Sequence, residues 1–198
     1  MKINKIILFF LCATVLPCKA GDNLMPHFSN KPVSLSEGPF SRSLKLNDNE
    51  KKKSKPWKEL LQKELNKEVN FAGHYRVVLI KDGAFPEECG GYEWVCGWII
   101  DKESGEIISE LPRFNNNTKY YSTLENGTPV SDEFDIEFYA NSSMMWISGM
   151  NKPVKGEWNE TKCATIVYDF VGNKFSIIKK WRCEVDVGDD KNANPYLP

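Results

Sequence analysis

The chain has 198 residues, with 26 Lys and Arg against 27 Asp and Glu, and a formal net charge of −1 at pH 7. This balance argues against a nucleic-acid partner, because binding to phosphates requires a basic face. The length suits one domain that buries a substantial core.

The N-terminus has the pattern of a cleaved secretory signal. An eleven-residue apolar run from Ile6 to Leu16 follows Lys2 and Lys5, and small residues precede a cut after Ala20. The run is shorter than the roughly 20 residues of a membrane-spanning helix. We therefore expect residues 1–20 to be removed, leaving a periplasmic or secreted chain (21–198) with no membrane segment. Removal leaves 23 basic against 27 acidic residues, a net charge of −4.

Residues 21–54 have no lasting hydrophobic period and contain several prolines and serines, which predicts an extended arm that lies over the domain. A helix is expected next, because Pro56 suits a first helical turn. Its apolar positions recur at helical spacing: Trp57, Leu60, Leu61, Leu65 and Val69.

After Asn70 the hydrophobic period changes to 2, which is typical of strands. Residues 75–80 form one expected strand. From Tyr92 to Ile100 the even positions are large or apolar, which puts Trp94 and Trp98 on the same, core-facing side. Residues 102–105 predict a hairpin turn into 107–108, and residues 134–138 and 144–147 predict further strands.

The last predicted hairpin joins residues 163–170 to 174–183 through Gly172-Asn173. It brings Cys163 within one register step of Cys183, and a bulge would absorb that step. The tail, residues 188–198, is expected to fray. The predicted fold is mainly β (α+β), with one N-terminal helix followed by an antiparallel meander of about seven or eight strands.

Four cysteines remain after removal of the signal: Cys89, Cys96, Cys163 and Cys183. An even number in an exported chain predicts two disulfides, and their spacing favours Cys89–Cys96 and Cys163–Cys183. The alternative is a four-cysteine metal site. Gaps of six and nineteen intervening residues do not supply the paired C-x(2–4)-C knuckles of such sites.

Catalytic motifs are absent from the sequence: it has no H-E-x-x-H, no G-x-S-x-G and no phosphate loop. Only two histidines occur, His27 and His74. The best acid–base pair joins His74 to Asp101 or Asp82, but no nucleophile is placed beside them. We therefore predict a partly buried, hydrogen-bonded histidine, no catalytic residue, no metal site and no cofactor.

One segment of about 40 residues resembles a family. It contains N-F-A-G-H-Y at residues 70–75, a Cys-Gly step at 89–90, and I-I-D at 99–101 followed by Gly105. This pattern resembles a group of small exported bacterial proteins with N-F-A-G-(H or K)-Y, a cysteine–glycine loop and I-D-x-x-x-G. The cysteines lie further apart here than in that group. The resemblance implies a β-rich periplasmic protein and no catalytic residue.

A binding protein is the function that this pattern favours. We expect a periplasmic inhibitor, in particular an immunity protein that neutralises a basic, cell-wall-directed toxin, because the mature chain is acidic. The loop at residues 82–93 offers contact residues: Phe85, Glu87, Glu88 and Tyr92. The same loop is also explained as a plain hairpin connection.

An exported hydrolase or glycan-binding protein is the alternative function. Four tryptophans would then serve as stacking platforms: Trp94, Trp98, Trp146 and Trp158. The expected core position of Trp94 and Trp98 disfavours that role for both.

Overall fold

The computed structural model describes residues 25–81, 83–122 and 134–183. The predicted signal, residues 1–20, and the predicted tail, 188–198, lie outside these ranges, as does Asp82. The order of elements is η1 (Phe28–Asn30), η2 (Glu50–Lys52), α1 (Lys55–Leu65), β1 (Tyr75–Ile80), α2 (Pro86–Cys89), β2 (Trp94–Asp101), β3 (Ile107–Glu110), β4 (Tyr120–Tyr121), β5 (Asp135–Phe138), β6 (Met144–Asn151), η3 (Trp158–Glu160), β7 (Lys162–Val171) and β8 (Lys174–Arg182).

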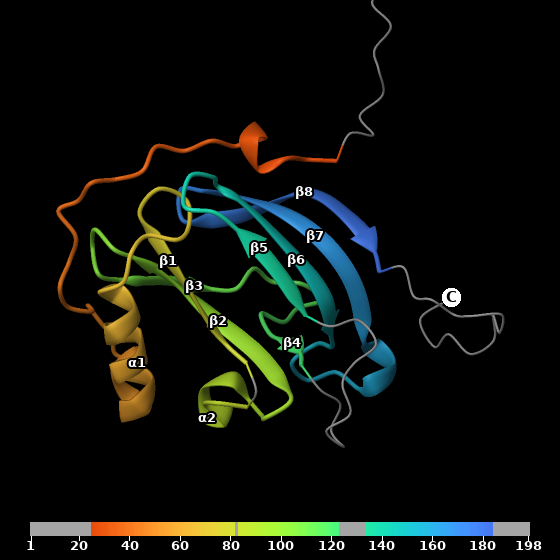
Figure 1. Ribbon diagram of the computed structural model, residues 1–198. Coiled ribbons are helices and arrows are strands. Elements are labelled where there is room, and N and C mark those ends of the chain that lie inside the picture. Colours follow the sequence, from red (N-terminus) through yellow and green to blue (C-terminus); the bar gives the residue numbers. More distant parts are fainter. Residues whose placement is uncertain (1–24, 82, 123–133, 184–198) are drawn as a thin grey trace, which may run out of the picture.

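Two four-stranded antiparallel sheets make up the fold, so the prediction of a mainly β protein is confirmed. The first sheet has the order β1-β2-β3, with β4 also paired to β2, and the second has the order β5-β6-β7-β8. Helix α1 lies on one side of the first sheet and the second sheet lies on the other (Figure 1). The predicted meander holds within β1–β3 and β5–β8. It fails at β4, which pairs with β2 instead of a neighbour in sequence.

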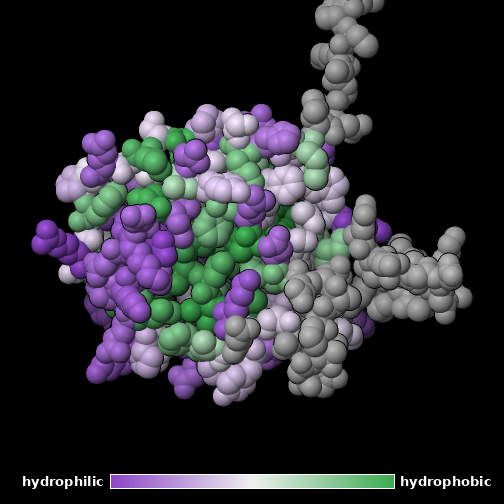
Figure 2. All heavy atoms as spheres, viewed as in Figure 1, coloured by the Kyte–Doolittle hydropathy of each residue, from purple (hydrophilic) through white to green (hydrophobic). Residues whose placement is uncertain are grey.

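The alternation along β2 separates two cores. Its odd residues Val95 and Ile99 face the second sheet, in a cluster that includes Ile147 and Ile166. Its even residues face α1 and pack with Trp57, Leu61 and Leu65; they are Trp94, Cys96, Trp98 and Ile100. Hydrophobic residues gather in the middle of the face shown in Figure 2, and hydrophilic ones cover the side where α1 lies.

Helix α1 begins where the sequence predicts. Ser54 is the N-cap and its side chain accepts a hydrogen bond from the backbone N–H of Trp57, while Pro56 lies in the first turn. The helix ends at Leu65, before Val69. Asn70 lies beyond this helix, and its side chain exchanges two hydrogen bonds with the backbone of Val77 in β1.

The arm, residues 25–54, crosses both sheets (Figure 1). Its backbone N–H groups donate to carbonyls of three separate turns; the pairs are Val33 with Asn141, Ser36 with Gly73, and both Ser41 with Lys102 and Lys45 with Gly105 in the turn after β2. Gly73 has a φ of +88°, and a Cβ there would lie 2.7 Å from the carbonyl oxygen of Ser34. Glycine is therefore required where the arm passes over this turn.

Both cysteine pairs form disulfides as the spacing predicts, Cys89–Cys96 and Cys163–Cys183. In the second pair, a bulge at Val167/Tyr168 shifts the register of β7 and β8. This bulge absorbs the step that the sequence leaves between the two cysteines. Disulfides are typical of proteins that fold outside the cytoplasm. None of the helices in the described ranges combines the length and hydrophobicity needed to cross a membrane.

Lys102 fastens the C-terminal end of α1 to the sheet. It is 3% exposed, and its ammonium donates to the backbone carbonyls of Leu65 and Lys67. We expect Lys102→Met to lower the free energy of unfolding by about 2–3 kcal/mol, because these carbonyls lose a charged donor. Urea unfolding measures the loss. Lys63→Met, at an exposed position of the same helix, should change the free energy of unfolding by less than about 0.5 kcal/mol. An equal loss in both variants would contradict this role of Lys102.

Candidate functional site

The loop between β1 and β2 carries the four residues predicted to contact a partner. Its helix α2 begins after Phe85, and the Cys89–Cys96 disulfide fastens the end of that helix to β2. Tyr92 is 72% exposed, and Glu87 is also exposed. An aromatic ring and a carboxylate are thus available on a loop that is cross-linked to the sheet.

Glu88 does not share this exposure, which corrects its predicted role. It is buried, and its carboxylate accepts a hydrogen bond of 3.0 Å from the backbone N–H of Ser54. Burial alone would raise the pKa of Glu88, but the hydrogen bonds from Ser54 outweigh it and hold the pKa below its ordinary value. Glu88 therefore joins the loop to the start of α1. Phe85 is half-buried against the core beneath α1, so it too has a structural role.

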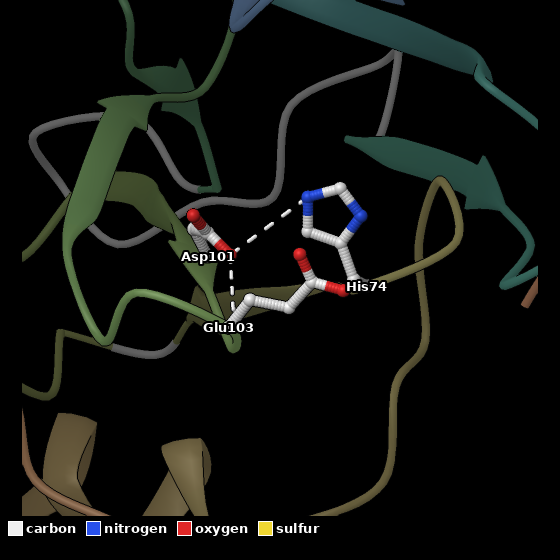
Figure 3. Close-up of side chains that lie close together, drawn as sticks. All are labelled: His74, Asp101 and Glu103. Atoms are coloured by element: carbon white, nitrogen blue, oxygen red, sulfur yellow. Dashed lines mark hydrogen bonds and ion pairs between the residues drawn. The ribbon is translucent and has the colours of Figure 1, made fainter. Parts of the chain in front are cut away.

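A second group of polar residues lies at the opposite end of the β1–β2 pair. Backbone pairing places Tyr75 opposite Asp101, so His74 precedes β1 beside the turn that follows β2. The His74 Nε2 atom lies 3.8 Å from Asp101 Oδ1, and the backbone N–H of Glu103 donates to the same oxygen at 2.9 Å. One imidazole nitrogen and two carboxylate oxygens lie within 4.8 Å of one another (Figure 3).

The carboxylates of this group affect the pKa of the neighbouring Tyr75. Its ring is buried and contacts the His74 ring at 4.0 Å between centroids, and its hydroxyl donates to Asn173 Oδ1 at 2.6 Å. Burial raises the pKa of Tyr75, and the charges of Asp101 and Glu103 raise it further. The phenol is therefore a neutral hydrogen-bond donor here.

An open pocket of about 450 Å³ lies beside His74 and Tyr75. Lys31 of the arm also lines this pocket, and its ammonium lies 2.6 Å from Asp169 Oδ2. Ser143 donates to the other oxygen of Asp169 at 2.6 Å. Burial alone would raise the pKa of Asp169, but Lys31 and Ser143 outweigh it and lower the pKa. This pair fixes the arm to β7.

The described contacts of His74 are with Asp101 and with the ring of Tyr75. Across the described ranges, no hydroxyl or thiol is hydrogen-bonded to His74, and all four described cysteines are in disulfides. The nearby Ser36 hydroxyl donates to Glu103 instead. A nucleophile activated by a base is recognised by their direct hydrogen bond, which His74 does not make.

The four tryptophans proposed as sugar platforms separate into two pairs. Trp94 and Trp98 are 7% and 5% exposed and belong to the core beneath α1. Trp146 is half-buried on β6, where its ring stacks 5.8 Å from that of Trp181, and Trp158 is 43% exposed. Only Trp146 and Trp158 of the four remain accessible.

Comparison of the chain with models of known protein families, with curated proteins and with solved structures found no match. The functional argument therefore depends on the residues and geometry above.

Sequence reasoning missed Glu103 and the Lys31–Asp169 pair. The sequence carries a signal for Glu103, since it lies two residues after Asp101 in a turn that the sequence predicts. Lys31 and Asp169 are 138 residues apart, and no local pattern links them.

Proposed function

We propose that the protein is exported to the periplasm and there binds and blocks another protein, in particular a toxin that attacks the cell wall. The observation that carries this proposal is the β1–β2 loop, where Tyr92 and Glu87 are exposed beside the Cys89–Cys96 disulfide. A cross-linked loop loses little entropy when it binds, and tyrosine is a frequent anchor residue in interfaces.

Three further observations support the same reading. The signal pattern at residues 1–20 and the two disulfides fit an oxidising compartment. The net charge of −4 after removal of the signal favours a basic partner. The resemblance to small exported bacterial proteins points to the same compartment.

The partner is best sought by a pull-down with the mature chain from periplasm of cells that express the neighbouring gene. Recovery of one protein, together with survival of cells that carry this chain and death of cells without it, would support an immunity role. If no protein is recovered and the pure chain hydrolyses or binds a glycan, the alternative of a hydrolase or glycan-binding protein replaces this proposal.

Two substitutions in the loop test separately its effects on the dissociation rate and on the association rate of the partner. We expect Tyr92→Ala to speed dissociation of the recovered partner about 30-fold, the equivalent of about 2 kcal/mol, because a contact aromatic is lost. Glu87→Lys should instead slow association about tenfold at low salt and make it less sensitive to salt. Surface plasmon resonance measures both rates.

Matched controls exist elsewhere on the surface. Tyr139→Ala removes another exposed tyrosine, and Glu37→Lys makes the same charge change on the arm. If these controls alter the rates as much as the loop variants do, the contact lies elsewhere and the loop is a plain connection between strands.

A further inference from the structure

Where β1 begins and β2 ends, the chain brings together three side chains of the types that commonly bind metal ions. His74 offers a nitrogen, and Asp101 and Glu103 each offer an oxygen, all within 4.8 Å of one another (Figure 3). Their positions follow from the backbone, since Asp101 is paired with Tyr75 and the N–H of Lys102 donates to the carbonyl of His74 at 3.1 Å. The group is therefore built on a strand pair and its tight turn.

Among the described residues, the negative charge of the Asp101 and Glu103 carboxylates is not matched by a lysine or arginine. Across the described ranges, neither Asp101 nor Glu103 has a lysine or arginine partner, and His74 is the one basic side chain that an ion-pair distance links to either. The nearby Lys102 ammonium is directed instead to carbonyls at the end of α1. Two carboxylates held this close repel each other, and a metal ion bound between them would offset that repulsion.

We propose that His74, Asp101 and Glu103 bind a zinc ion. One imidazole and two carboxylates form a nitrogen and oxygen donor set that suits Zn²⁺, whereas Ca²⁺ and Mg²⁺ prefer oxygen alone. Zinc ligands lie about 2.0–2.2 Å from the ion, and thus roughly 3.4 Å from one another in a tetrahedral site. The His74–Asp101 distance of 3.8 Å is close to this value, and the exposed Glu103 side chain has the freedom to close the rest.

A residue outside the ligand set orients Glu103. The Ser36 hydroxyl, on the arm, donates to Glu103 Oε1 at 2.5 Å. Such outer partners hold a metal ligand in its binding geometry. Three protein ligands leave at least one position of a tetrahedral ion open to water or to a side chain from a bound molecule. This site is independent of the proposed contact loop, which lies at the other end of the same two strands.

Isothermal titration of the oxidised, chelator-treated mature chain with Zn²⁺ alone tests the proposal. We expect one binding site per chain in the unmodified protein. His74→Ala should weaken zinc binding by more than the 10–100-fold typical for loss of an outer partner, and Ser36→Ala by about 10-fold. Titration with Ca²⁺ alone should give equal affinity with and without His74, because calcium does not use the imidazole.

His74→Lys is the decisive variant. Lysine neutralises the two carboxylates but remains protonated at pH 7 and supplies no metal ligand, so this variant should stay folded and lose zinc binding. The matched controls are His27→Ala, which removes the other histidine, and Glu106→Gln, at an exposed acid of the same hairpin; both should bind as the unmodified chain does. Zinc binding that persists in His74→Lys, that is lost in His27→Ala, or that is absent from the unmodified chain would overturn the proposal.

Discussion

Replacing Trp57 with alanine is expected to lower the free energy of unfolding by about 3–5 kcal/mol, the range for removing a large aromatic side chain from a core. Trp57 is 1% exposed, and its ring meets that of Trp98 edge-on with centroids 5.5 Å apart. It is the first large apolar residue of α1, and with Leu61 and Leu65 it covers the outer face of the first sheet. The loss therefore combines buried area with a cavity between helix and sheet.

Urea unfolding followed by circular dichroism measures this loss, which should lower the midpoint while the slope with urea stays constant. Trp57→Phe is the informative companion. The Nε1 atom of Trp57 is buried and has no hydrogen-bond partner in the described part of the chain, so Phe removes volume without breaking a hydrogen bond and should cost clearly less than Ala. Trp158→Ala, at a 43% exposed position, should cost less still. A midpoint for Trp57→Ala equal to that of Trp158→Ala would contradict the packing of α1.

The elements that the sequence predicts are those set by local patterns. Pro56 and the helical spacing of apolar residues predict α1, and the structure adds the cap at Ser54. The turn at Gly172-Asn173, where both residues have positive φ (57° and 63°), predicts the hairpin of β7 and β8. In each case a few neighbouring residues determine both the conformation and the buried face.

Features that depend on distant parts of the chain were not predicted. The alternation in residues 120–121 is too short to indicate β4, which exists because β2 offers an edge to Tyr120 and Tyr121. The carboxylate of Glu88 looks like a surface charge in sequence, yet Ser54, 34 residues earlier, makes it a buried acceptor. Hydrogen bonds between elements thus decided which of the predicted contact residues remain accessible.

The two proposed sites use the same strand pair in different ways. At one end, the loop of Glu87 and Tyr92 projects side chains outward beside a disulfide. At the other end, the start of β1, the end of β2 and the turn after it bring His74, Asp101 and Glu103 together. Because every residue of β1 is paired with β2, a loss of either site leaves the other testable on a folded chain.

Loss of the Cys163–Cys183 disulfide is the second large expected effect. The bridge closes a loop of sequence separation 20 and joins the start of β7 to the residue after β8, an edge strand of the second sheet. In the chain-entropy model, Cys163→Ser with Cys183→Ser should lower the free energy of unfolding by about 3 kcal/mol, because the unfolded chain regains the freedom of that loop. The shorter Cys89–Cys96 bridge, of separation 7, should contribute about 2 kcal/mol.

Which disulfide variant loses more free energy of unfolding is as informative as the size of each loss. Mass mapping of a non-reduced digest first establishes that both pairs form, and urea unfolding of each double variant then gives the two free energies. Native-state hydrogen exchange should show faster exchange of the β8 amides in the Cys163→Ser, Cys183→Ser variant, while amides of β1 and β2 keep their protection relative to global unfolding. A peptide that joins Cys89 to Cys163, or protection lost equally in both sheets, would show that the second bridge does not hold the edge strand in the way that the structure indicates.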